Sequence, residues 1–211
     1  MIDADSYLAL DHVFTGNMTG NLLFIGFAIA GVKTIPFVNN SLALLGFVVG
    51  TIVGGRIVGR GHPKGLPRVS AWVLLAGGLL AVGIATTWTV LRHLDQPILL
   101  VLTFLLACVM GSQVSAVKPI GNADVTTIVV TNTLANLARD SRIAGGKYEN
   151  WAPRLLAVAC MGVGAAIGAV IIHFSGGYFA LYAAMVFYLA GVLTLVLTSR
   201  AGAKVAVSAA V

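Results

Sequence analysis

The sequence predicts an all-α fold, a polytopic bundle of transmembrane helices that forms one membrane domain over residues 1–211. Hydrophobic residues make up 58% of the chain and charged residues only 9%, whereas soluble domains carry about 25% charged residues. Mean hydropathy is +0.96. Six uncharged stretches approach the length of about 20 residues that a helix needs to cross a bilayer. They are Val13–Val32, Val38–Gly55, Ser70–Leu91, Pro97–Val117, Leu155–Phe174 and Tyr178–Ser199. The lipid bilayer is therefore the expected surrounding partner.

A polar break interrupts the first of these stretches. Residues 15–21 read Thr-Gly-Asn-Met-Thr-Gly-Asn and lie between apolar runs. Non-helical backbone at membrane depth persists only where protein or a water-filled cavity satisfies its polar groups. We therefore expect a broken helix here, after an acidic N-terminal segment that contains Asp3, Asp5 and Asp11.

A second break follows the fourth stretch. Gly121–Asp124 interrupts the chain, and Val125–Ala138 then runs for 14 residues without a charge. As a helix this run is about 21 Å long, which is too short for a hydrocarbon core of about 30 Å. The sequence thus predicts a broken, re-entrant segment within residues 119–136.

Small residues recur at helical spacing along two of the stretches. The positions are Gly46, Gly50 and Gly54 in the second stretch, and Gly162, Gly164, Ala166 and Gly168 in the fifth. Such faces let the backbones of two membrane helices approach closely. We expect helix packing at these positions, and the same faces are suited to a homodimer.

An internal repeat relates the two halves of the chain. A shift of 112 residues aligns Thr19–Leu22 with Thr131–Leu134, Val38–Gly55 with Leu155–Phe174, and Ser70–Leu91 with Tyr178–Ser199. Repeat 1 then covers residues 1–92 and repeat 2 residues 97–200. The stretch Pro97–Val117 has no counterpart in repeat 1, so repeat 1 is expected to lack its first helix.

Basic residues gather in the connections Arg56–Arg68 and Arg139–Arg154 and in the tail with Arg200 and Lys204. Cytoplasmic loops are enriched in Lys and Arg, so the net charge of +6 reflects topology, and no nucleic-acid partner is expected. The 56–68 loop and the C-terminus are predicted to be cytoplasmic. This orientation requires a re-entrant Gly121–Ala138 and makes the two repeats inverted, as in many secondary transporters.

Two motifs surround the breaks. The first is Asp3-Ala4-Asp5-Ser6-Tyr7-Leu8 with Val13-Phe14 and Asn17-Met18-Thr19-Gly20-Asn21, and the second is Asp124–Leu134 with Leu137-Ala138-Arg139-Asp140-Ser141. In these motifs the chain resembles the YoaK-like family of bacterial integral membrane proteins over essentially its whole length. The resemblance implies a fold and a membrane location, and it implies no substrate. The family usually has an apolar segment before the first motif, which is missing here.

Side chains in and near the breaks offer hydrogen-bond donors and acceptors without a fixed charge. The candidates for substrate binding are Asn17, Thr19, Asn21, Gln113, Thr131, Asn132, Thr133 and Asn136. Paired breaks at repeat-related positions indicate a transport site, here for a neutral or zwitterionic solute or a small ion. The same side chains could instead join helices through hydrogen bonds worth about 0.6–2 kcal/mol each.

Asp11 and Asp124 flank the two breaks. A carboxylate in or near a span is a candidate for proton or cation coupling, although both could also be ordinary interfacial residues. The four histidines have no ligand spacing, so no metal site is expected. Motifs of hydrolases, metalloproteases and phosphate-binding loops are absent, so we expect neither an enzyme nor a cofactor.

The sequence therefore predicts a multi-pass protein of the bacterial inner membrane that transports or conducts a small solute. The alternative is a non-transporting scaffold or partner subunit that packs through its glycine-rich faces. A hydrated cavity lined by Asn21 and Asn132 would favour transport. A dry interface with its polar groups satisfied would favour the scaffold.

Overall fold

The computed structural model describes residues 1–10, 12–60, 66–120, 130–146 and 150–208, with side chains as far as residue 199. Its helices are α1 (Ile2–Ala9), α2 (Met18–Ile29), α3 (Phe37–Val58), α4 (Arg68–Leu91), α5 (Gln96–Val117), η1 (Lys118–Ile120), α6 (Val130–Arg139), η2 (Arg142–Ala144), α7 (Trp151–Ser175) and α8 (Gly177–Ser208). Every regular element within these ranges is helical. The all-α prediction is confirmed.

Five of the helices are long and apolar enough to cross a membrane. They are α3, α4, α5 together with η1, α7, and α8 as far as Ser199, each of 22 to 25 residues. Their outward faces carry large apolar side chains, among them Phe174 with 80% and Val90 with 76% of its surface exposed. Exposed apolar surface on this scale marks contact with lipid or protein. The chain is a multi-pass membrane protein.

The first of the six predicted stretches is not a span. The prediction over Val13–Val32 is wrong because the helix there, α2, has only 12 residues, or about 18 Å. It begins only after Asn17, and it is followed by Gly31 at a φ of 95°, a conformation that glycine adopts without strain. The break therefore shortens this helix rather than bending a full-length span.

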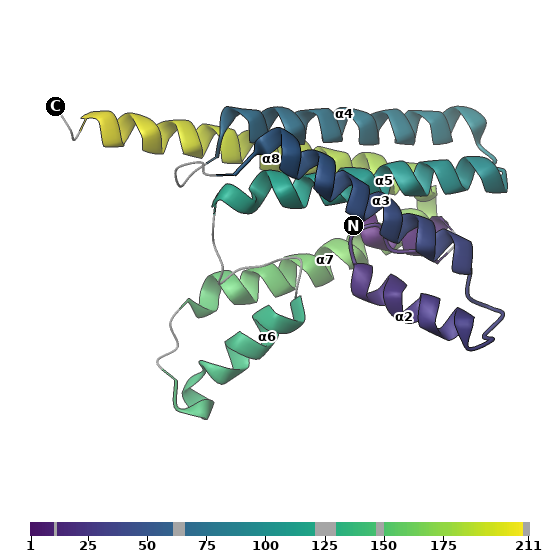
Figure 1. Cartoon of the computed structure of the whole chain (residues 1–211). Coiled ribbons are helices and arrows are strands. Elements are labelled where there is room, and N and C mark those ends of the chain that lie inside the picture. The colour runs from purple at the N-terminus through teal and green to yellow at the C-terminus, as the bar shows by residue number, and fades with distance from the viewer. Residues whose placement is uncertain (11, 61–65, 121–129, 147–149, 209–211) are drawn as a thin grey trace.

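Figure 1 shows α3, α4, α5 and α8 gathered in one bundle, with α7 and α6 diverging from it. The bundle core contains Ala85, Leu106 and Leu181, all completely buried. Helix α1 packs on α7 and α8, α2 packs on α3, and α6 packs on α7. Apart from Gln113 on α5, the described candidate site residues therefore lie at the periphery of the bundle, in or next to its short helices.

The glycine face of α3 packs directly on the backbone of α5. A Cβ atom added at Gly46 would lie 2.6 Å from the carbonyl oxygen of Phe104, and one added at Gly50 would overlap the carbonyl group of Cys108. Two hydrogen bonds cross the same seam: the Thr51 hydroxyl donates to the Gly111 carbonyl (3.3 Å), and the Ser115 hydroxyl donates to the Thr51 carbonyl (2.8 Å). The predicted packing role of these glycines is confirmed.

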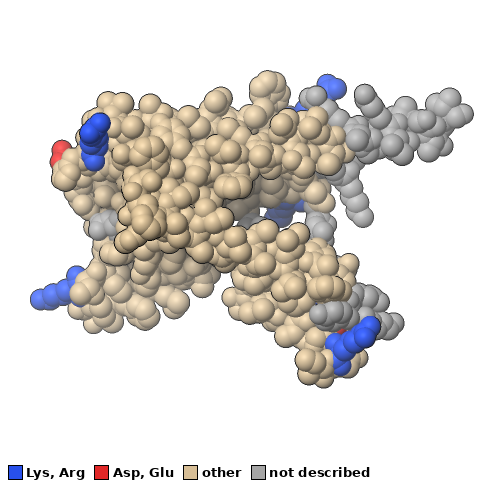
Figure 2. Space-filling view, turned by 180° about the vertical axis from the view of Figure 1, so that it is seen from behind, with Lys and Arg blue, Asp and Glu red and all other residues tan. Residues whose placement is uncertain are grey.

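Lys and Arg side chains lie at opposite ends of the molecule in Figure 2, with few on the apolar surface between them. In Figure 1 the ends of α3 and α5 and the start of α4 lie at one end of the bundle, and the start of α7 lies on the same side but away from the bundle, on the diverging arm. The predicted orientation, with the 56–68 loop and the C-terminus on the cytoplasmic side, remains a prediction, as do the inverted repeat and the re-entrant segment.

Candidate functional site

The loop before α2 is held by a carboxylate of the N-terminal helix. Asp3 Oδ1 accepts hydrogen bonds from the backbone N–H of Thr15 (3.0 Å) and of Gly16 (2.6 Å), and from the Thr15 hydroxyl (3.4 Å). Hydrogen bonds to a charged acceptor are among the stronger ones in proteins. Asp3 therefore fixes the backbone of the predicted break against α1.

The amide of Asn21 closes the same loop from the other side. Its Oδ1 accepts from the Phe14 N–H (3.0 Å), and its Nδ2 donates to the Phe14 carbonyl oxygen (2.6 Å). Asn21 is completely buried, so both backbone groups of Phe14 are satisfied without water. An Asn amide can make four hydrogen bonds, and the backbone of Phe14 accounts for two of those of Asn21.

The two remaining candidates of the first break have different surroundings. Asn17 is the N-cap of α2, where its Oδ1 accepts from the Gly20 N–H at 3.4 Å, the ordinary role of Asn at this position. Thr19 is exposed in the first turn of α2. Of the three candidates at this break, Asn17 and Asn21 therefore hold its backbone, and only Thr19 is exposed.

The candidates of the second break lie on α6. Thr131 and Asn132 are exposed, whereas Thr133 is buried. Asn136 offers its backbone carbonyl oxygen to Arg154 of α7 at 3.3 Å. On α6, Thr131 and Asn132 are thus exposed, whereas the backbone of Asn136 contacts α7.

A buried arginine joins the end of α6 to α7. Arg154 is only 6% exposed, and its Nη1 lies 2.7 Å from Asp140 Oδ2. Asp140 also accepts from Nε of the exposed Arg139 at 3.0 Å. The hydrogen bond from Arg154, with the one from Arg139, lowers the pKa of the Asp140 carboxyl below its usual range. This ion pair joins the two helices of the α6–α7 arm (residues 130–146 and 150–175).

The structure does not bring the two sets of candidates into one cluster. Helix α2 packs on α3 and helix α6 on α7, and no extensive contact joins α2 to α6 among the described residues. Gln113 lies on α5, where its Oε1 is buried and accepts no hydrogen bond. Asp11 and Asp124, the predicted coupling residues, lie outside the described residues.

Sequence reasoning missed Asp5. Its side chain is 1% exposed, and neither carboxylate oxygen has a hydrogen-bond partner. Burial raises the pKa of this carboxyl to about 8. A signal was available, because residues two apart on a helix point roughly 200° apart. Asp3 and Asp5 therefore lie on opposite sides of α1 and cannot both face the loop.

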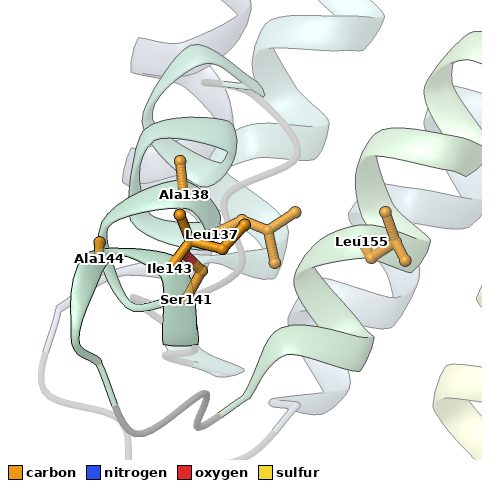
Figure 3. Close-up of a pocket in the computed structure, with 6 residues that line it drawn as sticks. All are labelled: Leu137, Ala138, Ser141, Ile143, Ala144 and Leu155. Carbon is orange, nitrogen blue, oxygen red and sulfur yellow. The ribbon is translucent and has the colours of Figure 1, made fainter.

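The described residues form a recess beside the α6–α7 arm (Figure 2) and shallow hollows on the arm and on α4. Figure 2 shows the recess between the main bundle and the α6–α7 arm. A hollow of about 470 Å³ lies on the arm itself, where Leu155 of α7 faces residues of α6 and the turn after it (Figure 3). A second hollow, of about 550 Å³, lies along α4 between Leu79 and Leu91. Both are open and mostly apolar, and neither contains a candidate side chain.

Comparison with known proteins agrees with this membrane architecture. The family model described as "Protein of unknown function (DUF1275)" matches residues 1–195. The UPF0700 transmembrane protein YoaK of Bacillus subtilis (strain 168) is 32% identical over 140 residues, which are 66% of this chain and 61% of that protein. No solved structure matches. The predicted resemblance is confirmed, and the chain belongs to the DUF1275 family of membrane proteins, which includes YoaK.

Proposed function

We propose that the protein transports or conducts a small neutral or zwitterionic solute, or a small ion, across the bacterial inner membrane. The observation that carries this proposal is the pair of short helices, α2 with 12 residues and α6 with 10 described residues, beside five full spans. Discontinuous helices are the usual source of substrate groups in secondary transporters, because their ends leave backbone donors and acceptors available.

The two short helices contribute differently to the proposed site. Asp3, Asn17 and Asn21 are occupied in holding the backbone before α2, so they form the frame of one half. Thr131 and Asn132 of α6 are exposed and lie on the arm that borders the recess in Figure 2. An amide and a hydroxyl can donate to and accept from a polar solute without a net charge. We therefore assign direct solute contact to α6.

A thermal-shift screen tests the assignment. A solute that binds only the folded protein raises its free energy of unfolding, by about 2.7 kcal/mol at 100 times its Kd. We expect the double variant Thr131→Val/Asn132→Leu to abolish the shift caused by an active solute. Because both residues are exposed, the melting temperature without solute should stay close to that of the unsubstituted protein.

A matched control lies on α4. Thr87 is exposed and its hydroxyl donates within its own helix to the Gly83 carbonyl (2.9 Å), so Thr87→Val should keep the full thermal shift. If the α6 double variant responds to the solute as strongly as Thr87→Val does, the solute binds elsewhere and the assignment to α6 fails.

One observation favours the second candidate, a scaffold or partner subunit. Helix α7 repeats the small-residue pattern of α3, yet a Cβ atom added at Gly162 would meet no atom within 4 Å. Ala159 and Ala166, on the same face of α7, are exposed as well. On this face a helix of a second copy of the chain can approach the α7 backbone as closely as α5 approaches the α3 backbone.

Cross-linking in membranes tests that alternative. The chain has two cysteines, Cys108 and Cys160, so a variant with both replaced by alanine and with Ala166→Cys carries one thiol on this face. Oxidation should yield a disulfide-linked dimer if two α7 faces pack together, and adding Gly162→Leu should reduce its yield. If oxidation yields only monomer, both with and without Gly162→Leu, then the proposed α7 homodimer is wrong.

A further inference from the structure

We propose that Asp5 is a reversible proton-binding site, and that its proton controls how α1 and the loop held by Asp3 sit against α7 and α8. The inference concerns α1 alone and does not require the proposed solute. It begins from the carboxylate of Asp5, which is 1% exposed and has no hydrogen-bond partner at either oxygen. Native proteins rarely leave such groups unpaired, and each instance calls for a physical explanation.

Among the side chains that the structure describes, α7 and α8 offer the carboxylate no counter-charge. Helix α1 contacts α7 where Gly168 approaches Met1 and Ala4. It also contacts α8, whose first residue, Gly177, approaches Ala9. The titratable side chains of α7 are directed elsewhere, since Cys160 and His173 are exposed and Arg154 pairs with Asp140. As far as residue 199, where the described side chains end, those of α8 are the tyrosines Tyr178, Tyr182 and Tyr188.

The described residues of α1 and of the loop that follows it contain four more titratable groups. The Met1 amino group is the cation that acts on Asp5, Asp3 faces the loop, Tyr7 stacks on Phe14 at 4.9 Å, and His12 is exposed. An ionised carboxylate is costly in such surroundings unless it is paired. The neutral acid removes that cost, and the pKa of Asp5, raised by burial to about 8, agrees with the geometry.

Helix α1 connects this proton to the first break. Asp5 and Asp3 are two residues apart on the same short helix, and Asp3 holds the N–H groups of Thr15 and Gly16. When Asp5 loses its proton, the charge favours movement of α1 away from α7 and α8 towards water. Such a movement pulls Asp3 away from the loop or carries the loop with it, so the backbone before α2 changes with the protonation of Asp5.

Infrared difference spectroscopy of the purified protein tests the proton site. The carbonyl band of a protonated carboxylic acid should be present at about pH 6 and lost by about pH 10, on either side of the raised pKa. Asp5→Asn, a neutral side chain of nearly the same shape, should lack that band. Asp95→Asn, which removes an exposed carboxyl at the N-cap of α5, should keep it. A wild-type protein without the band at about pH 6, or an Asp5→Asn protein that retains it, overturns the proton site.

Hydrogen–deuterium exchange tests the connection to the loop. The wild-type protein and Asp5→Asn are compared at the same pH, so that the intrinsic pH dependence of amide exchange cancels. At about pH 6 both should protect the segment 13–17 equally, because both carry a neutral residue 5. At about pH 10 the wild-type segment should exchange faster than that of Asp5→Asn. Equal protection at both pH values would overturn the connection. Neither experiment involves a solute, so their failure is distinct from failure of the transport proposal.

Discussion

Replacing Gly50 by leucine is expected to lower the free energy of unfolding by about 4 kcal/mol or more. The first carbon of the new side chain would already overlap the carbonyl group of Cys108, and a helix backbone cannot rotate away as a side chain can. Relief requires α3 and α5 to separate along the whole seam, which also breaks the hydrogen bonds between Thr51 and the α5 residues Gly111 and Ser115. The destabilisation would be measured as a lower melting temperature of the detergent-purified protein and as loss of the monodisperse peak in size-exclusion chromatography.

Gly162→Leu is the matched control. Both glycines lie mid-helix in a small-residue pattern, and they align under the shift of 112 residues, but Gly162 has open space around its Cα. In monomeric protein its replacement should be neutral, or stabilising by up to about 1 kcal/mol because leucine is the better helix former. Equal destabilisation by both substitutions would contradict the close α3–α5 approach as the cause.

Replacing Asn21 by leucine is expected to cost about 2–5 kcal/mol. Leucine has as many side-chain heavy atoms as asparagine but neither donor nor acceptor, so the N–H and the carbonyl oxygen of Phe14 lose their partners beside a completely buried side chain. Leaving a buried polar group unsatisfied costs about 1–3 kcal/mol, and here there are two. Thermal melts over a series of denaturing detergent concentrations would measure the loss.

Asn132→Leu provides the comparison for this prediction. Asn132 occupies the related break but is exposed on α6, so its replacement should change the free energy of unfolding by no more than about 0.5 kcal/mol. If instead Asn132→Leu destabilises the protein as strongly as Asn21→Leu, then the amide of Asn132 carries structural hydrogen bonds, and its assignment to solute contact is wrong.

The spanning helices and the glycine seam could be predicted from the sequence because both depend on local composition. Uncharged runs of sufficient length have few alternatives to a membrane helix, and glycines four residues apart mark one face of it whatever lies opposite. The length of α2 could not be predicted in this way. The polar residues 15–21 indicate a break but not the residue at which the helix begins. The helix starts after Asn17 because Asp3 and Asn21, both outside residues 14–17, fix the loop backbone.

The candidate site was harder to predict for the same reason. Asn21 aligns with Thr133 in the repeat, and both are buried, whereas Asn132, the amide of the second break next to Thr133, is exposed. The sequence shows that an amide is present, and only the packing of neighbouring helices decides whether it faces protein or water. Asp5 illustrates the same limit, since its burial depends on α7 and α8, more than 140 residues later in the chain.

The seam between α3 and α5 also has a consequence for biosynthesis. The two helices are separated in the chain by α4, so α3 enters the bilayer before the surface that fits its glycines has been translated. Until α5 is inserted, lipid or the insertion machinery has to cover that groove. Helix α4 is by then already in the membrane next to α3. A ribosome that pauses before Gln96 would therefore leave a membrane intermediate with an open groove, and quality-control proteases could recognise it.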